Sequence, residues 1–449
     1  MIQNNLFFTP NEVRDFGSVL TDVQEYISSK YSSLLIEGTK DDVKEQIKLY
    51  ISKYLMDNRV TVDGMDNDLL IDRLYVEMAE FSFLTKYIFG TGIEEINVNA
   101  WNDIEIHKAG GETIKLDEHF DSPQHAINVV RRMLHVSGMV LDNAAPAVLG
   151  HLSKNIRIAV LKTPLVDEDV GVAASIRIVN PQNFTKADFV KAKTATDDMM
   201  DFLSECLRFG VSTCVAGATS SGKTTVAGWL LNTIPDHKRI FTIENGSREL
   251  ALVRSRNGKV LNSVIHTLTR ASENEMQNID QDILLDFALR FNPEIICVGE
   301  MRGPEAYTAQ EASRTGHTVL TTIHSNSCES TYRRMVTLCK RKYDISDETL
   351  LSLVTEAFPL VVFTKQLENR VRKIMEIMEC EILPDGSRKY RTIYRYKITE
   401  NRIDQNRLII NGHHEKISDI SESLQKRLME NGMSKDALDK LIKGGGAKC

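Results

Sequence analysis

The nine residues GATSSGKTT, from Gly217 to Thr225, have the types and the spacing needed to bind a phosphate chain. They satisfy the pattern GxxxxGK[ST] at Gly217, Gly222, Lys223 and Thr224. The glycines permit backbone angles that turn successive N–H groups toward phosphate oxygens, and a helix that follows adds the positive end of its dipole. We expect Lys223 to reach the β- and γ-phosphates and the Thr224 hydroxyl to ligate magnesium. The predicted phosphate-binding residues are Gly217, Ala218, Thr219, Ser220, Ser221, Gly222, Lys223, Thr224 and Thr225.

Hydrolysis of a bound nucleotide also needs a carboxylate near the magnesium, at the end of a neighbouring strand. The run EIICVGE supplies Glu300, which we expect to hold magnesium through water. Glu244 ends the run RIFTIE, and Glu249 follows five residues later. Either of these two glutamates could position the attacking water, and the sequence does not choose between them.

His317 and His324 bracket the run TVLTTIH, which has the composition of a buried strand. Sheets of the α/β class bind ligands at the ends of their strands. We therefore predict a functional role for both histidines, His324 in catalysis and His317 in binding the nucleotide.

The elements that position these residues are indicated by an alternation of strand and helix patterns. Continuous apolar, β-branched runs are typical of parallel strands that are buried on both faces. Segments of helical length separate these runs, which favours a doubly wound parallel sheet with helices on both faces. The predicted strands are STCVAG, RIFTIEN, EIICVGE, TVLTTIHS and PLVVFTK.

The rest of the chain divides into further segments around this sheet. Residues 1–85 show helical periodicity, and residues 86–180 form a smaller α/β domain with a hairpin at Gly110-Gly111 and strands in IRIAVL and AASIRIV. Residues 181–195 have the composition of a linker. The nucleotide-binding domain is expected to span 196–395, and 396–449 to be a helical tail.

Composition limits the class of protein. The chain has 449 residues and a net charge of −7, which gives no electrostatic case for wrapping a nucleic acid. No apolar run is long enough to span a membrane, and the N-terminus lacks the pattern of a secretory signal. The seven cysteines form no CxxC pair. We expect a cytoplasmic protein with free thiols.

Taken together, GATSSGKTT, TIENGSREL, NPEIICVGEMRGPEA and TGHTVLTTIHSNS resemble the four signature boxes of the secretion and traffic ATPases. These are the hexameric motors of type II and type IV secretion, type IV pili and conjugation. The resemblance covers about residues 90–395 and is greatest to the tight-adherence (Tad) pilus ATPases of CpaF type.

This resemblance implies a RecA-like P-loop NTPase domain, with ATP and Mg²⁺ as substrate and cofactor. It makes the first box a Walker A motif, the third a Walker B motif ending at Glu300, and the fourth a histidine box. It also nominates arginines that reach the nucleotide from a neighbouring subunit or from the N-terminal domain. These are Arg270, with Arg254 and Arg256 as weaker candidates, and Arg157 and Arg177 in the smaller domain.

Two departures from the family pattern affect these assignments. The second box usually begins Glu-Asp, but here it begins Glu244-Asn245 and is one residue longer. The segment from Glu249 to Arg270 is also longer than usual. The tetracysteine zinc module of some type II members is absent, which favours the Tad or type IV branches.

The resemblance predicts a hexameric ATP-driven motor for pilus assembly or protein secretion. It would lie at the cytoplasmic membrane through an inner-membrane platform or a secretion-channel protein, without direct contact to nucleic acid. The alternative is the ATPase of a conjugative or DNA-uptake machine. A GTPase is disfavoured because TKAD, residues 185–188, precedes the P-loop, and a small-molecule kinase because it would need a lid rich in arginine.

Overall fold

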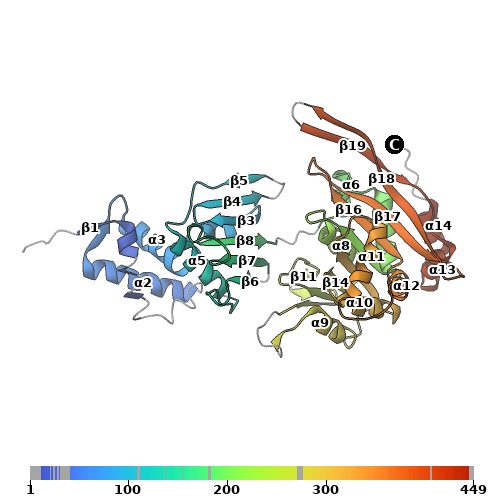
Figure 1. Ribbon diagram of the computed structural model, residues 1–449, viewed down its shortest axis with the longest axis horizontal. Coiled ribbons are helices and arrows are strands. Elements are labelled where there is room, and N and C mark those ends of the chain that lie inside the picture. Colours follow the sequence, from blue (N-terminus) through green and yellow to red (C-terminus); the bar gives the residue numbers. More distant parts are fainter. Residues whose placement is uncertain are drawn as a thin grey trace, which may run out of the picture. The chain divides into compact units, whose positions relative to one another are not determined.

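The computed structural model describes residues 12–20, 22, 23, 26, 27, 30, 41–108, 112–135, 137–153, 155–179, 184–270, 277–404 and 407–443. The chain divides into two compact units, Met1–Val179 and Asn180–Cys449. Figure 1 colours them from blue to green and from green to red. Each unit contains two hydrophobic clusters of its own.

The first unit begins with a small helical part. In α2 (Asp41–Asn58) the residues Ile47, Ile51 and Leu55 recur every fourth position, so they lie on one face and are buried. This face packs on α3 (Asn67–Ala79). Two short strands, β1 (Glu12–Arg14) and β2 (Val60–Val62), pair in parallel here. The expected region of helices therefore also contains strands.

A six-stranded antiparallel sheet forms the rest of the first unit, in the order β5-β4-β3-β8-β7-β6. Alternate residues of β8 are buried, because α5 covers one face of the sheet and the other face is polar. The expected strands IRIAVL and AASIRIV are β7 and β8; the Gly110-Gly111 turn lies outside the described residues. The elements are η1 (Ser82–Leu84), α4 (Thr85–Ile88), β3 (Ile93–Ala100), β4 (Asp103–Lys108), β5 (Thr113–Lys115), α5 (Pro123–His135), β6 (Ala147–Ser153), β7 (Ile156–Lys162) and β8 (Val172–Ile178).

The second unit is built on a nine-stranded sheet in the order β13-β10-β14-β15-β9-β16-β17-β18-β19. The six strands from β13 to β16 are parallel, and the last three are antiparallel. Every residue of β9 and β10 is buried, as their continuous apolar runs predict. The strands are β9 (Thr213–Gly217), β10 (Ile240–Glu244), β13 (Val264–Leu268), β14 (Ile295–Met301), β15 (Thr318–Ile323), β16 (Leu360–Gln366), β17 (Arg372–Ile382), β18 (Arg388–Asp404) and β19 (Arg407–Lys416).

Helices cover both faces of this sheet, so the predicted doubly wound α/β architecture is confirmed. One core joins α7, α8, α13 and α14 to the sheet, and a second joins α9 to α12 to its opposite face. The helices are α7 (Asp197–Arg208), α8 (Lys223–Asn232), α9 (Gln281–Ala288), α10 (Glu305–Arg314), α11 (Cys328–Cys339), α12 (Asp347–Ala357), α13 (Glu422–Glu430) and α14 (Lys435–Lys443).

The second unit differs from the expected boundaries at both of its ends. The expected linker contains a helix, α6 (Lys186–Lys191). The expected helical tail is wrong at its start, because β18 continues to Asp404 and β19 returns to Lys416 before α13 begins. β18 has aromatic and β-branched residues at alternate positions, whereas β19 does not and is held as a strand by pairing with β18. Figure 1 shows the β18–β19 hairpin extending past the neighbouring strands.

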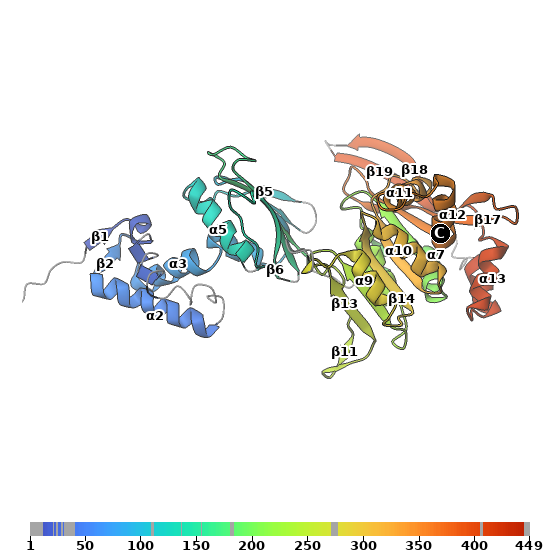
Figure 2. The same ribbon diagram turned by 60° about the horizontal axis from the view of Figure 1, so that its bottom comes forward.

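The segment between β10 and β13 contains a second, smaller hairpin. Its strands are β11 (Ser255–Arg256) and β12 (Lys259–Val260), which pair antiparallel. Figure 2 shows this hairpin projecting from the sheet. It lies within the segment from Glu249 to Arg270.

Candidate functional site

The GATSSGKTT segment forms a loop between the end of β9 and the start of α8. Gly222 has φ +94° and stands at the N-terminus of α8, and Ser220 has φ +60°. Gly222 provides no side-chain cap, so the first N–H groups of α8 keep their capacity to bind an anion. The loop therefore has the backbone form of a phosphate cradle.

Hydrogen bonds to β16 hold this loop in shape. The Ser221 hydroxyl donates to the carbonyl of Ala218 at 2.8 Å and lies 3.0 Å from the hydroxyl of Thr364. Thr364 in turn donates to the carbonyl of Ala216 at 3.1 Å. A Cβ at Gly217 would overlap the Thr364 carbonyl oxygen and the Ser221 hydroxyl. Only glycine fits at this position.

Lys223 is buried at the first position of α8, although its side chain is cationic. Its ammonium donates to the carbonyl of Ala218 at 2.8 Å and lies 3.5 Å from Nδ1 of His324. The side chain thus folds back across the loop. Thr224 and Thr225 are half-buried on the next positions of α8, and Ala218, Thr219 and Ser220 are exposed.

Sheet order brings His324 and Glu300 to the same place. The strands β14, β15 and β9 lie side by side and run parallel. Their carboxyl ends therefore lie at the same end of the sheet, beside the loop. Nε2 of His324 lies 2.8 Å from Oε1 of Glu300. The two groups are not aligned as a hydrogen bond, so this buried oxygen has no hydrogen-bond donor among the described residues. The other oxygen, Oε2, accepts from Arg302 at 2.6 Å.

Electrostatics keep this cluster in a defined protonation state. Burial raises the pKa of Glu300, but the hydrogen bond and charge of Arg302, together with His324 and Lys223, lower that pKa by more. Burial and the charge of Lys223 hold the pKa of His324 below its ordinary value. At neutral pH the cluster therefore combines an ionised carboxylate with a neutral imidazole.

The two other predicted carboxylates have different surroundings. Glu244 is buried, and its Oε2 accepts the N–H groups of Glu249 at 2.6 Å and Leu250 at 2.9 Å. Its Oε1 lies 3.5 Å from Thr242 Oγ1 and from Nδ1 of His266. Glu244 therefore anchors the backbone of the loop that follows β10.

Glu249 is only half-buried, and its charge acts on Arg302 and raises the pKa of that guanidinium, after the larger effect of Glu300. Gly299 makes room here, since a Cβ would come within 3.1 Å of the Ile243 carbonyl.

The expectation that His317 binds the nucleotide is corrected by the strand direction. His317 precedes β15, whereas His324 follows it, so the two histidines lie at opposite ends of this strand. Six residues of extended strand separate them by about 20 Å. His317 is instead held by its backbone N–H, which donates to Ala312 at 3.1 Å.

Arg270 lies just past the carboxyl end of β13, the edge strand of the sheet, where it bridges to Ile279 and is exposed. Four strand spacings, about 19 Å, separate β13 from β9. Arg270 therefore lies too far away to contact a phosphate held by its own loop. Arg254 donates to the carbonyls of Asn232 and Ile234 at the end of α8, away from the loop. Arg256 is exposed on the small hairpin.

Arg157 and Arg177 lie in the first unit. They are directly opposite each other on β7 and β8, on the face of the sheet that α5 does not cover, and both are half-buried. Glu95 is the next residue across from Arg177, on β3. The pair gives this face a local positive charge.

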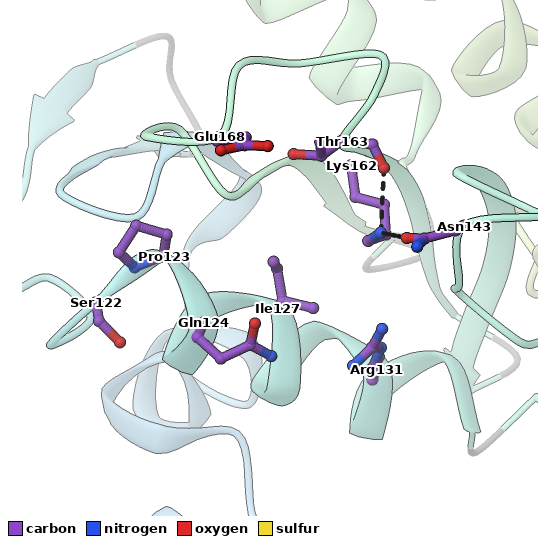
Figure 3. A pocket seen from close by; sticks show the side chains of 9 residues that line it. All are labelled: Ser122, Pro123, Gln124, Ile127, Arg131, Asn143, Lys162, Thr163 and Glu168. Atoms are coloured by element: carbon purple, nitrogen blue, oxygen red, sulfur yellow. Dashed lines mark hydrogen bonds between the residues drawn. The ribbon is translucent and has the colours of Figure 1, made fainter.

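The first unit also contains a cavity of about 430 Å³ beside the start of α5, shown in Figure 3. The buried ammonium of Lys162 donates to Asn143 Oδ1 at 2.6 Å and to the Thr163 carbonyl at 3.1 Å. Exposed Arg131 and Glu168 place opposite charges at its rim. The cavity therefore has no clear preference for a ligand of either charge.

Sequence reasoning missed the contribution of Thr364 and also that of Arg372, at the start of β17. Arg372 donates from Nε to the carbonyl of Ser220 at 2.8 Å. These residues follow the loop by 143 and 152 positions. No local pattern marks them, because their contacts depend on the order of strands in the sheet.

A glycine-containing loop between a buried parallel strand and a helix, with a lysine at the start of the helix and a carboxylate at the end of another strand of the sheet, is the arrangement of a P-loop. The chain matches the family described as Type II/IV secretion system protein over residues 146–442. Since this is more than half of its length, the chain belongs to that family.

Similar proteins include the uncharacterized protein MJ0900 of Methanocaldococcus jannaschii, 25% identical over 73% of this chain and 56% of that protein. The type IV secretion system protein PtlH of Bordetella pertussis is 31% identical over 41% of this chain and 54% of PtlH. The chain thus spans about half the length of both relatives. The solved structure of the ATPase DotB of Legionella pneumophila is 17% identical, covers 79% of this chain and 84% of DotB, and has a TM-score of 0.46.

Within the part of the chain that the structure describes, no helix is both long and apolar enough to cross a membrane.

Proposed function

We propose that the protein is an ATP-hydrolysing motor of a secretion or pilus machine. One observation carries this proposal: Lys223, His324 and Glu300 lie together at the carboxyl ends of the parallel strands, beside a loop with the backbone form of a phosphate cradle. Membership of the Type II/IV secretion system protein family supports the coupling to secretion.

The residues of the site fit a nucleotide with magnesium. The cradle stands at the N-terminus of α8, where Gly222 supplies no side-chain cap, and Oε1 of Glu300 is buried without a hydrogen-bond donor among the described residues. Thr224 and Glu300 would hold Mg²⁺, the glutamate through water. When bound, the ion would neutralise charge on the phosphate oxygens.

The reaction breaks the bond between the γ-phosphorus of ATP and the oxygen that stays on ADP, while a water forms the new bond. Lys223 would leave the Ala218 carbonyl and bind the β- and γ-phosphates. A carboxylate must hold the attacking water and receive its proton. Glu300 or Glu249 fits this role better than Glu244, whose Oε2 is taken up by two backbone N–H groups.

A complete site would also need positive charge on the nucleotide from outside the second unit of the same copy. Arg270 lies at the far edge of its own sheet, which supports action on the loop of a neighbouring copy. Arg157 and Arg177 would close over the nucleotide from the first unit. Such arginines raise turnover by 10³-fold or more in nucleoside triphosphatases that use them. A ring of copies, a hexamer by resemblance, would then couple hydrolysis to movement of the units.

The partner that receives this movement would be an inner-membrane platform or a secretion-channel protein at the cytoplasmic face of the membrane. By resemblance the machine is a Tad-type pilus. The name of PtlH supports a type IV secretion system as the wider class.

Turnover of ATP by the purified chain tests the proposal. We expect Mg²⁺-dependent hydrolysis, preference for ATP over GTP, and specific activity that rises with protein concentration as copies associate. Lys223→Ala should abolish turnover, whereas Lys340→Ala, on an exposed surface, is the matched control. Turnover that survives Lys223→Ala would refute the assignment of the site.

A further inference from the structure

Three consecutive residues at the start of β17 contact three different parts of the second unit. The first, Arg372, reaches the phosphate loop: its Nε donates to the carbonyl of Ser220 at 2.8 Å. Its Cδ also lies 3.4 Å from where a Cβ of Gly222 would stand. Ser220 has φ +60°, a conformation that costs a non-glycine residue energy. Arg372 therefore helps to hold the loop in its strained, phosphate-ready form.

The next two residues contact the segment that enters the second unit from the first. The buried ammonium of Lys373 donates to the carbonyl of Lys193. The backbone N–H of Ile374 donates to the carbonyl of Thr194 at 2.9 Å. Both acceptors belong to the stretch between α6 and α7. The start of β17 is thus bonded to the end of the predicted linker.

The same point also contacts the β18–β19 hairpin. The ring of His414, on β19, donates from Nε2 to the carbonyl of Ile374 at 2.9 Å. The ammonium of Lys373 lies 5.4 Å from the centre of the Tyr396 ring, on β18. Ile374 therefore uses both backbone groups, one toward the linker and one toward the hairpin.

We propose that Arg372 is a positioning residue that couples the phosphate loop to the linker through the start of β17. This inference rests on the proposed function. Arg372 holds the Ser220 carbonyl, and the adjacent Lys373 and Ile374 hold the linker. Neighbouring side chains of a strand point to opposite faces of the sheet. One short stretch of backbone can therefore hold the phosphate loop on one face and the linker on the other. A change of the loop on binding or releasing phosphate then moves the backbone that bonds Lys193 and Thr194.

β17 is suited to this task because it is stiff. It has 11 residues; its start, including Arg372 and Lys373, pairs with β16, and from Glu376 onward it pairs with β18 as well. Lys373 is buried, and burial, with a smaller effect of Lys193, lowers its pKa. A buried ammonium that lost its carbonyl partner would be costly, so the contact to the linker resists breaking.

The test compares Arg372→Ala, Arg372→Lys and Lys373→Met with the unaltered chain, and uses Arg395→Ala as control. Arg395 is exposed on β18 and pairs with Glu376, away from the loop. Hydrogen exchange is followed in peptides that cover 192–197 and 370–375, which exclude Glu376, with and without saturating ADP and Mg²⁺. The ATPase kcat and KM are measured on the same samples.

We expect ADP to slow exchange severalfold in both peptides of the unaltered chain. Arg372→Ala should lose this effect while still binding ADP, and should raise KM about tenfold, as for loss of one charge-assisted bond, with a smaller change in kcat. Arg372→Lys should restore part of both. Lys373→Met should lose the effect in 192–197 alone.

The inference is overturned if Arg372→Ala keeps both the ADP effect and the KM, or if it behaves like Arg395→Ala. It is also overturned if ADP binds the unaltered chain without changing exchange in either peptide. A chain that neither binds nor hydrolyses nucleotide would refute the proposed function itself, and the inference with it. The two failures are therefore distinguishable.

Discussion

Glu300 contacts His324, which lies beside the P-loop lysine, and one buried oxygen of Glu300 has no hydrogen-bond donor among the described residues. We predict that Glu300→Gln lowers kcat about 100-fold or more while nucleotide binding persists. The amide keeps the size of the side chain but can neither take a proton nor carry a charge. Single-turnover hydrolysis and binding of fluorescent ADP measure the two effects.

Glu249→Gln is the matched comparison for this prediction. If Glu249→Gln lowers kcat as much as Glu300→Gln does, both carboxylates act on the water. If only Glu249→Gln is inactive, then Glu249 is the base and the prediction for Glu300→Gln is wrong.

A different outcome is predicted for Glu244→Gln. This change removes the negative charge that accepts two backbone N–H groups of the next loop. We expect a loss of about 1–2 kcal/mol in the free energy of unfolding, because charge-assisted bonds are stronger than neutral ones. Denaturant melts give the value, and a fall in kcat without any fall in stability would contradict an anchoring role.

At the scale of single residues, the sequence predicted the types of group in the site but not their contacts. The phosphate loop was predictable because its glycines and lysine are contiguous. The role of Glu244 depends on the backbone path of the loop after β10, which no local pattern encodes. The separation of His317 from His324 follows from strand direction, so the sequence did contain the information to exclude His317.

Among the elements, the β18–β19 hairpin has a titratable contact with the start of β17. Burial lowers the pKa of His414 to about 4, and its Nε2 donates to Ile374. A histidine with a lowered pKa binds its proton more readily in the unfolded chain. Its contribution is thus complete above the unfolded pKa, near 6.5, and is lost as the pH falls toward about 4.

We therefore predict that acidification from pH 7 to pH 5 costs about 1–2 kcal/mol at this site. His414→Gln, which keeps a donor without titrating, should flatten this part of the pH profile. Denaturant melts at several pH values measure it. An equal slope in the variant would assign the pH dependence to other groups.

The strands of the second unit were predictable because continuous apolar runs mark burial on both faces. The boundary at residue 395 was not. The amphipathic pattern of α13 is regular, and because of it the whole segment 396–449 was predicted to be helical. The preceding strands instead depend on pairing across a hairpin, which only the fold reveals.

For the whole molecule, the position of Arg270 at the far edge of the sheet predicts shared active sites. Lys223→Ala and Arg270→Ala should each be inactive alone. Mixed in equal amounts, they should recover activity, because about a quarter of the sites in a symmetric ring would combine an intact loop with an intact arginine. ATP turnover of the mixture measures this recovery.

Each variant at twice its concentration is the control for the mixture. No recovery on mixing, with activity retained by Arg270→Ala alone, would indicate sites that are complete within one copy.

The late position of β16 and β17 in the sequence has a consequence for synthesis of the chain. Ser221 bonds to Thr364 and Ser220 to Arg372, contacts that span 143 and 152 residues. A nascent chain that has left the ribosome only as far as Ala357 already contains GATSSGKTT, but it lacks the strands that shape it. We therefore expect the chain to gain its capacity to bind nucleotide only near the end of translation, after β17 has been made.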